Sequence, residues 1–298
     1  MGVGTPIVPG QQAPLLFSSP AGRVSRGGSR LRRLREARGI TREAAGYAIR
    51  ASESKISRME LGRVSFKTRD VEDLLTLYGI TDRQERSSLL LLAKEANVAG
   101  WWHSYSDVLP TWFPTYVGLE GAASLIRAYE VQFVHGLLQT AEYARAVVRR
   151  GMRDAADEDV ERRVALRLER QKHLVAENAP EFHVVLDEAA LRRPYGDREV
   201  MRGQLRHLVE MSERPNIRLQ VMPFRFGGHS GESGAFTILG FPESDLSDVV
   251  YLEQLTSALY LDKREDVAQY ERVLDELMRD GPGPEESRDL LRGLLQLQ

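Results

Sequence analysis

Residues Thr41 to Arg63 read TREAAGYAIRASESKISRMELGR. The stretch contains two short helical patterns, separated by a tight break at Arg50 and Ala51. Small residues at Ala45 and Gly46 allow the two helices to approach each other closely. A shared apolar seam can be formed by Ile49, Ile56 and Met59. This spacing is typical of a helix-turn-helix, whose second helix enters the major groove of DNA.

Basic residues are concentrated around this motif. The segment from Arg23 to Arg69 holds 14 Lys and Arg residues against four Glu residues, so its formal charge is +10, whereas the rest of the chain carries −12. A basic segment on an acidic body favours a module that binds a polyanion, joined to a domain with another task. The alternative is an all-helical protein-binding domain with incidental spacing, and the charge disfavours it.

Helical patterns flank the motif on both sides and predict a five-helix, all-α helix-turn-helix domain over residues 29–98. Thr41 and Ser52 are expected to cap the two helices of the motif. Residues 1–28 are rich in Gly, Pro, Ser and Gln and predict a disordered arm. The arm ends with two arginines, at positions 23 and 26, which are either simply solvated or lie along nucleic acid.

The composition changes at Gly100, and residues 99–298 are expected to form a second domain. Residues 101–117 read WWHSYSDVLPTWFPTYV and hold all three tryptophans, which favours a segment packed over the second core; the alternative is an aromatic wall for a ligand or partner. Beyond it, strand and helix patterns alternate. Strands are expected at Leu125–Val134, Phe182–Leu186, Ile217–Met222, Ala235–Phe241 and Val249–Leu252. The fold class is therefore multi-domain, with a mixed α/β (α+β) domain following the helical one.

A long helix rich in Arg and Glu is expected at Asp157–Glu177. Its apolar positions are Val160, Val164, Leu168 and Leu174. They serve either to pack the helix on its own sheet or to form a dimer interface.

The motif resembles the phage-repressor-like helix-turn-helix regulators, known as the XRE family. The matching positions are Thr41, Ala45, Ile49, Ser52, Ser54, Ile56, Ser57, Glu60 and Gly62. Two positions depart from the family pattern: Arg42 replaces the usual Gln, and Arg50 replaces the frequent Gly of the turn. The second departure costs stability if the backbone dihedral φ at Arg50 is positive.

The resemblance implies roles for individual residues. Recognition-helix positions that face bases or phosphates are occupied by Glu53, Ser54, Lys55 and Arg58. Phosphate contacts that set the register on DNA are expected from Arg42, Ser52, Ser57 and Arg63. Glu60 is expected to stay within the protein and pair with an arginine near the turn. Replacing both Lys55 and Arg58 by Ala should weaken DNA binding by several kcal/mol, at roughly 1–3 kcal/mol per base contact.

Four segments of the second domain resemble the domain of unknown function DUF5753. They are WWHSYSDVLPTWFPTYVGLE from Trp101, GLLQTAEYARAVV from Gly136, FHVVLDEAALRRPYG from Phe182 and YLEQLTSALYLD from Tyr251. The resemblance implies an antitoxin-like actinobacterial regulator, in which this domain follows a helix-turn-helix of the XRE type and a small partner protein is often encoded nearby. It implies no chemistry for the domain itself. His135 stands where the family commonly has a proline.

Several classes of protein are disfavoured. The chain has no cysteine, so a disulfide framework, a thiolate zinc site and a cysteine nucleophile are excluded. The six histidines show no close metal-type spacing, and no metal or cofactor is expected. The longest purely aliphatic run, Leu89–Ala93, is too short to cross a membrane, and the start of the chain does not match a secretory signal. We expect a cytoplasmic protein that does not act at a membrane.

An enzyme is the weaker alternative. Asp187 and Glu188 follow a predicted strand, where carboxylates can act as acid and base, but they also suit the start of a helix. His229 lies in the glycine-rich loop FGGHSGESG, which lacks the lysine of a phosphate-binding loop. A hydrolase-like body would need Asp187, Glu188 and His229 to converge on one pocket. We therefore expect a protein without catalytic residues.

The sequence thus predicts a transcriptional regulator that binds double-stranded DNA with a recognition helix at about residues 52–60. A homodimer would supply a second half-site, and the C-terminal domain would hold the dimer or sense a ligand or partner. The ligand-binding residues are not predictable from the sequence. The alternative function is that of an antitoxin-like protein that neutralises a small partner protein and binds DNA for autoregulation.

Overall fold

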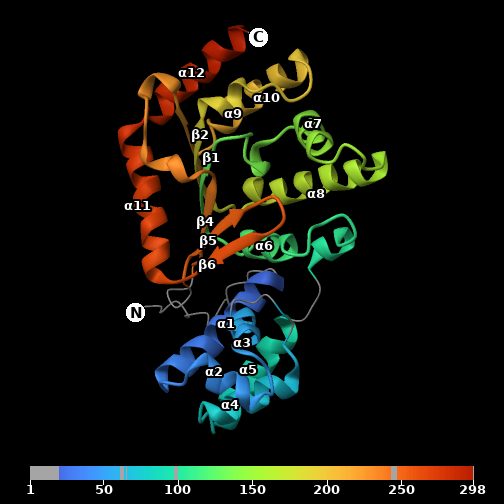
Figure 1. Cartoon of the computed structure of the whole chain (residues 1–298), viewed down its shortest axis with the longest axis vertical. Coiled ribbons are helices and arrows are strands. Elements are labelled where there is room, and N and C mark those ends of the chain that lie inside the picture. Colours follow the sequence, from blue (N-terminus) through green and yellow to red (C-terminus); the bar gives the residue numbers. More distant parts are fainter. Residues whose placement is uncertain (1–19, 61–63, 65, 97–99, 243–246, 298) are drawn as a thin grey trace, which may run out of the picture.

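The computed structural model describes residues 20–60, 64, 66–96, 100–242 and 247–297, in a helical N-terminal domain and a sheet-containing C-terminal domain (Figure 1). The expected multi-domain fold is therefore confirmed. The N-terminal helices are α1 (Pro20–Ala37), α2 (Arg42–Ala48), α3 (Glu53–Glu60), α4 (Thr68–Leu77) and α5 (Arg83–Ala96).

One apolar core holds these five helices together. Its fully buried members include Leu31, Ile56, Met59, Phe66, Val71, Leu74, Leu75 and Tyr78. Each large apolar side chain that is removed from water contributes about 1.5–3 kcal/mol, so this core fixes the positions of α2 and α3. The predicted seam of Ile49, Ile56 and Met59 lies within it.

Helix α1 begins earlier than the sequence suggested. Residues 20–28, which we assigned to a disordered arm, are helical, whereas residues 1–19 of that arm lie outside the described residues. Pro20 suits a first helical position, because its missing N–H would have no partner there. Gly28 is buried, and a Cβ atom on it would lie 2.5 Å from the main-chain oxygens of Met59 and Glu60. Gly28 therefore serves close packing of α1 on α3, and this contact outweighs its low helix propensity.

The C-terminal domain is built on a six-stranded mixed sheet with the strand order β3-β2-β1-β4-β5-β6. The strands are β1 (Leu125–Glu130), β2 (Glu181–Asp187), β3 (Ile217–Met222), β4 (Phe236–Gly240), β5 (Val249–Glu253) and β6 (Ala258–Leu261). Strands β1, β2 and β3 run parallel, and β4, β5 and β6 continue the sheet with antiparallel pairs. The carboxyl ends of the parallel strands therefore meet at one end of the sheet.

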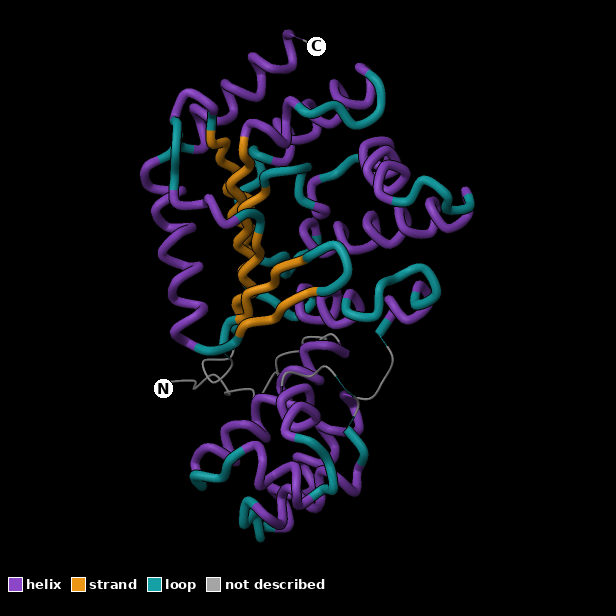
Figure 2. The backbone as a smooth tube through the Cα atoms, in the orientation of Figure 1, coloured by secondary structure: helices purple, strands orange, loops and turns teal. Residues whose placement is uncertain are grey.

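Helices cover both faces of this sheet (Figure 2). They are α6 (Phe113–Glu120), α7 (Ala141–Gly151), α8 (Asp157–Val175), α9 (Glu188–Arg192), α10 (Arg198–Met211), α11 (Arg264–Asp280) and α12 (Pro284–Leu297). Helices α6, α7, α8, α10 and α12 pack against the core on one face, and α11 packs against the core on the other. Buried side chains on both faces explain the apolar runs of β2 and β3.

The expected strands are present, with one difference in length. The strand predicted at Leu125–Val134 ends at Glu130, because the chain leaves the sheet towards the short 3-10 helix η2 (Gly136–Leu138). Helix α6 was not predicted, because it is short and carries no amphipathic pattern, whereas α9 begins where Asp187 and Glu188 were interpreted as the start of a helix. The long helix α8 buries Val160, Val164 and Leu174 within its own domain and leaves Leu168 partly exposed. The first of the two alternatives for this helix is therefore confirmed for those three residues.

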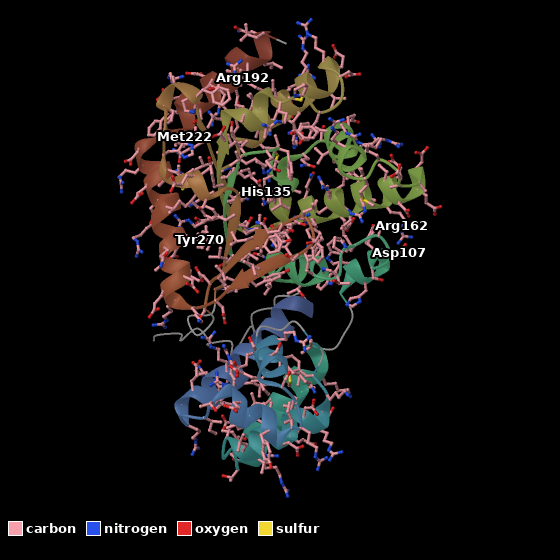
Figure 3. The ribbon with its side chains drawn as sticks, in the orientation of Figure 1. Asp107, His135, Arg162, Arg192, Met222 and Tyr270 are labelled. Carbon is pink, nitrogen blue, oxygen red and sulfur yellow. The ribbon has the colours of Figure 1, made fainter. Side chains whose placement is uncertain are left out.

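The aromatic segment packs on the second domain, as the favoured interpretation predicts. Trp102, in the 3-10 helix η1 (Trp101–Tyr105), is buried with Val117 and Leu166. The Nη2 atom of Arg162 in α8 donates a hydrogen bond to Asp107 Oδ1 over 2.8 Å and ties the segment down (Figure 3). None of the described helices is long and apolar enough to cross a membrane.

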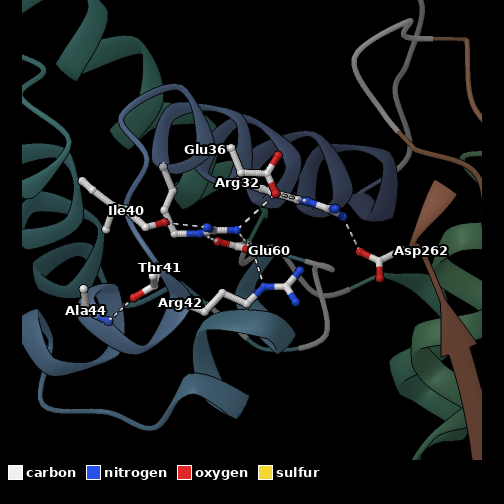
Figure 4. A network of polar contacts seen from close by, with 9 residues as sticks. Arg32, Glu36, Ile40, Thr41, Arg42, Ala44, Glu60 and Asp262 are labelled. Carbon is white, nitrogen blue, oxygen red and sulfur yellow. Dashed lines mark hydrogen bonds and ion pairs between the residues drawn. The ribbon is translucent and has the colours of Figure 1, made fainter. Parts of the chain in front are cut away.

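The two domains contact each other through α1. This helix packs near α6, and the Arg32 Nη1 atom donates a hydrogen bond to Asp262 Oδ2, just after β6 (Figure 4). The same arginine bonds Glu36 within α1 over 2.9 Å. Helix α1 is thus shared between the core that positions α3 and the contact with the C-terminal domain.

Candidate nucleic-acid interface

Two side-chain caps define the helices of the predicted motif. The Thr41 hydroxyl accepts a hydrogen bond from the Ala44 N–H over 3.1 Å, and the Ser52 hydroxyl accepts one from the Lys55 N–H over 3.2 Å. Both caps were predicted, and each satisfies a helix N–H group that has no partner within the helix.

The turn between α2 and α3 is a Schellman motif. The Ala51 N–H donates to the Gly46 oxygen over 2.8 Å, and the Arg50 N–H donates to the Tyr47 oxygen over 3.1 Å. Arg50 has a φ of 54°, the conformation that favours glycine, so the strain expected at this position is present. Gly46 permits the tight return of the chain, since a Cβ atom there would lie 2.8 Å from the Ala51 oxygen.

Replacing Arg50 by Gly is expected to raise the free energy of unfolding by about 0.5–1 kcal/mol, because glycine accepts a positive φ without steric cost. Urea unfolding followed by circular dichroism measures the change. Arg50→Ala is the matched control: it removes the same side chain but keeps the Cβ atom, and it should not stabilise. Equal stability of the Gly and Ala variants would contradict the assigned strain.

Helix α3 has one buried and one exposed face. Ile56, Met59 and Glu60 are buried. The opposite face exposes four of the predicted contact residues, namely Ser52, Glu53, Ser54 and Arg58. Ser57 is half-buried at the boundary between the faces. Two serines, one glutamate and one arginine are therefore exposed on a helix that is fixed from behind by the core.

Arg58 is the cation on this face whose donors remain available for a ligand. Its Nε atom donates to the Ser54 main-chain oxygen over 3.3 Å, and among the described residues it has no ion pair. A guanidinium has five donors, so most remain available to a base or a phosphate.

Lys55 was also predicted to face bases or phosphates, but its ammonium group is already paired within the protein. The Nζ atom lies 2.6 Å from Asp70 Oδ2 in the first turn of α4, and both side chains are largely covered. To contact a base, Lys55 would have to leave this carboxylate. Its role as a base-contacting residue remains a prediction.

Glu60 pairs with two arginines and joins three helices (Figure 4). Its carboxylate accepts hydrogen bonds from Arg35 Nε over 2.5 Å and from Arg42 Nε over 3.0 Å, and its side chain is 2% exposed. The Arg35 Nη1 atom also donates to the Ile40 oxygen over 2.7 Å. The predicted pairing of Glu60 with an arginine near the turn is confirmed.

The network also changes how Arg42 is understood. This arginine, predicted to contact phosphate, uses its Nε atom on Glu60 but keeps part of its side chain accessible. It can meet a phosphate only with its remaining donors. Arg63, the other predicted phosphate-contacting arginine, lies outside the described residues.

Sequence reasoning missed two exposed residues beside α3. Tyr47 of α2 is 87% exposed, and Arg50 projects from the turn. Tyr47 does not belong to the apolar positions of α2. A large aromatic residue outside the buried face of a helix indicates a contact surface, and this signal was present in the sequence. Together with Ser54 and Arg58, these residues form one polar and aromatic surface on α2, the turn and α3, which we call the α3 surface.

The carboxylates considered for catalysis serve local structure. Asp187 Oδ1 caps α9 by accepting from the Ala189 N–H over 2.8 Å, as the helix-start interpretation predicts. Glu188 Oε1 lies 2.5 Å from Arg192 Nε, and its Oε2 atom accepts from the Phe224 N–H over 2.7 Å. Glu188 is therefore held by α9 and the chain after β3.

His229 does approach Asp187, which the sequence did not indicate. Its Nε2 atom lies 3.5 Å from Asp187 Oδ2 and 3.3 Å from the Tyr129 hydroxyl, while its Nδ1 atom accepts from the Gly231 N–H. Both ring nitrogens therefore have partners in the protein, and the cluster fastens the glycine-rich loop to β1 and β2. Within the part of the chain that the structure describes, no group of three His, Asp or Glu side chains could hold a metal ion.

Comparison with known protein families gives two matches. A family model described as a helix-turn-helix domain matches residues 28–89, and one described as a domain of unknown function (DUF5753) matches residues 113–293. No curated protein and no solved structure matches the chain. The first match covers the α3 surface, and the second covers the sheet and most of the helices around it.

Proposed function

The chain belongs to the DUF5753 family and carries a helix-turn-helix domain in front of that domain, and from this premise we propose that it is a sequence-specific DNA-binding transcriptional regulator. Helix α3 enters the major groove, and Arg58 with Ser54 contacts base edges there. Tyr47, Arg50 and Arg42 contact the phosphate backbone around it.

The observation that carries this proposal is the division of α3 into two faces. Its buried face is fixed by the core and by Glu60, whereas Ser54 and Arg58 project into solvent without an ion-pair partner among the described residues. A rigid helix with free donors on its outer face suits direct readout of bases, since recognition requires side chains that are held in register.

Binding should fall steeply with salt. On a duplex that the wild-type protein selects from a randomised pool, the logarithm of the association constant should decrease linearly with the logarithm of salt concentration, with a slope of about −0.9 per phosphate neutralised. Competition gel shifts at several salt concentrations measure this slope. Binding that does not change with salt would overturn a charge-driven interface.

The C-terminal domain supplies the regulatory part of this proposal. It holds a homodimer, so that two α3 helices reach half-sites about one helical turn apart, or it senses a ligand or partner. We assign it no catalytic role, because the hydrogen bonds of Asp187, Glu188 and His229 are used within the fold. A regulator of this kind acts in the cytoplasm.

A second candidate function is that of an antitoxin-like protein that neutralises a small partner protein. The observation that favours it is the partly exposed Trp101, which stands 43% exposed at the edge of the aromatic segment. Co-purification with the product of a neighbouring gene, unaffected by Arg58→Glu and lost in Trp101→Ala, would support this function. If the partner co-purifies equally with both variants, the surface around Trp101 does not bind it.

A further inference from the structure

Helix α1 is fixed tightly to α3. Leu31 of α1 is buried in the same core as Met59 of α3. A Cβ atom on Gly28 would lie 2.5 Å from the main-chain oxygens of Met59 and Glu60, so the two helix backbones are in close contact. The Arg35 Nε atom donates to the Glu60 carboxylate over 2.5 Å. Because backbone contact, apolar packing and an ion pair join the two helices, a movement of α1 also moves α3.

The same helix is held by the C-terminal domain (Figure 4). Arg32 Nη1 donates a hydrogen bond to Asp262 Oδ2, and the two side chains are only 23% and 12% exposed. Burial disfavours the charge of Arg32, but the carboxylates of Glu36 and Asp262 outweigh this effect and raise the pKa of the guanidinium. The contact between the domains is therefore a largely buried ion pair, and removing one partner of such a pair is costly.

A chain of alternating charges leads from this contact to α3 and α2. The Glu36 carboxylate accepts hydrogen bonds from Arg32 Nε over 2.9 Å and from Arg35 Nη2 over 3.3 Å. Arg35 in turn bonds Glu60, which also accepts from Arg42 Nε over 3.0 Å. A displacement at the domain contact therefore reaches α3 through the α1 backbone and also through these side chains.

Asp262 connects the edge of the sheet to a long helix on one of its faces. It directly follows β6 and precedes α11, which begins at Arg264. Strand β6 is the last strand of the sheet and pairs with β5, and residues 254–257 between these two strands are exposed. A short strand at the edge of a sheet shifts at a lower free-energy cost than a central one. A ligand or partner that moves β6 or α11 would therefore move Asp262.

We propose that Asp262 is a positioning residue for DNA binding, which through Arg32 holds α1, and with it α3, in the orientation that binds DNA. Orientation matters because the chain outside residues 23–69 carries a charge of −12 and is repelled wherever it approaches the phosphates. The C-terminal domain then regulates DNA affinity by keeping or releasing this contact. The contact itself is independent of the proposed function, whereas its effect on DNA rests on that function.

Competition gel shifts with the selected duplex test the proposal. Asp262→Asn should weaken binding at least about threefold, as expected if about a third or less of the molecules keep the binding orientation. The sign is decisive, because removing a negative charge would by itself strengthen binding to DNA. Glu265→Gln is the matched control: it removes the same charge from an exposed position three residues further on and should bind at least as tightly as the wild type. Asp262→Glu keeps the carboxylate and should recover most of the affinity.

A double-mutant cycle shows whether Asp262 acts through Arg32. In a protein that already carries Arg32→Met, the Asp262→Asn change should no longer weaken binding, since its partner is absent. Tryptophan fluorescence in urea checks that the C-terminal domain remains folded in each variant. An equal loss with and without Arg32, or an Asp262→Asn protein that binds DNA as tightly as the Glu265→Gln control, would overturn the proposal.

A distance between the domains tests the contact without DNA. Because the chain has no cysteine, spin labels can be attached at the exposed positions Glu72→Cys in α4 and Arg206→Cys in α10. Pulsed electron paramagnetic resonance should give one narrow distance distribution in the labelled wild type and a broader one once Asp262→Asn is added. An unchanged distribution overturns the proposal whether or not the protein binds DNA. If the distribution broadens but the wild type selects no duplex, the proposed function fails, and with it the effect on DNA, while the contact between the domains stands.

Discussion

Replacing Glu60 by Ala is expected to lower the free energy of unfolding of the helix-turn-helix domain by about 3–5 kcal/mol. The substitution leaves Arg35, whose side chain is 7% exposed, without its carboxylate in a site from which water is excluded. It also removes the bond to Arg42 and so detaches α2 from the end of α3. Glu60→Gln should lower the free energy of unfolding by less, because its amide oxygen still accepts one of these hydrogen bonds.

Two signals separate this effect from general destabilisation. Urea unfolding monitored by far-ultraviolet circular dichroism includes the N-terminal helices, whereas tryptophan fluorescence reports only on the C-terminal domain. The first transition should move to lower urea in Glu60→Ala, and the second should stay in place. Glu72→Ala, an exposed change on α4, is the control and should shift neither. A Glu60→Ala protein as stable as this control would show that the buried network does not hold the domain together.

The substitution Arg58→Glu should reduce affinity for the selected duplex by about 100-fold, or about 3 kcal/mol. It removes the free guanidinium of the α3 surface and places a carboxylate against the DNA. Because Arg58 is exposed and has no ion pair among the described residues, the unfolding curve should remain that of the wild type. Gel shifts at fixed salt measure the change.

A charge-matched variant shows whether position or total charge matters. Arg202→Glu changes the net charge equally on the exposed side of α10, in the other domain, and should leave DNA affinity nearly unchanged. Lys55→Ala tests the second basic residue predicted to read bases. Because Lys55 pairs with Asp70, its replacement should lower stability as well as affinity. Equal losses in Arg58→Glu and Arg202→Glu would mean that net charge alone governs binding.

The helix-turn-helix was predictable because its signals are local. Thr41 and Ser52 cap helices within three residues of themselves, and Ile56 and Met59 share a face by helical spacing. The resemblance to a known family added that Glu60 stays inside. The strand pattern of the second domain was readable for the same reason, since each strand is an apolar run between turn residues.

The errors and omissions came from contacts between distant segments. The start of α1 at Pro20 depends on Gly28 packing against α3, and the engagement of Lys55 depends on Asp70 in another helix. Neither contact can be predicted from the spacing of neighbouring residues, because each joins residues that are far apart in the sequence. The approach of His229 to Asp187 and Tyr129 likewise joins a loop to β2 and β1, which only the folded sheet brings together.

The absence of cysteine allows a direct test of the central claim that α3 lies on DNA. A single cysteine at Ser54, labelled with an iron chelate that cleaves nearby nucleotides, should cut the selected duplex at a defined position within each bound site. The same label at Arg202 should produce no cleavage above background. Strong cleavage from position 202, or none from position 54 while the protein is bound, would contradict the placement of α3 in the groove.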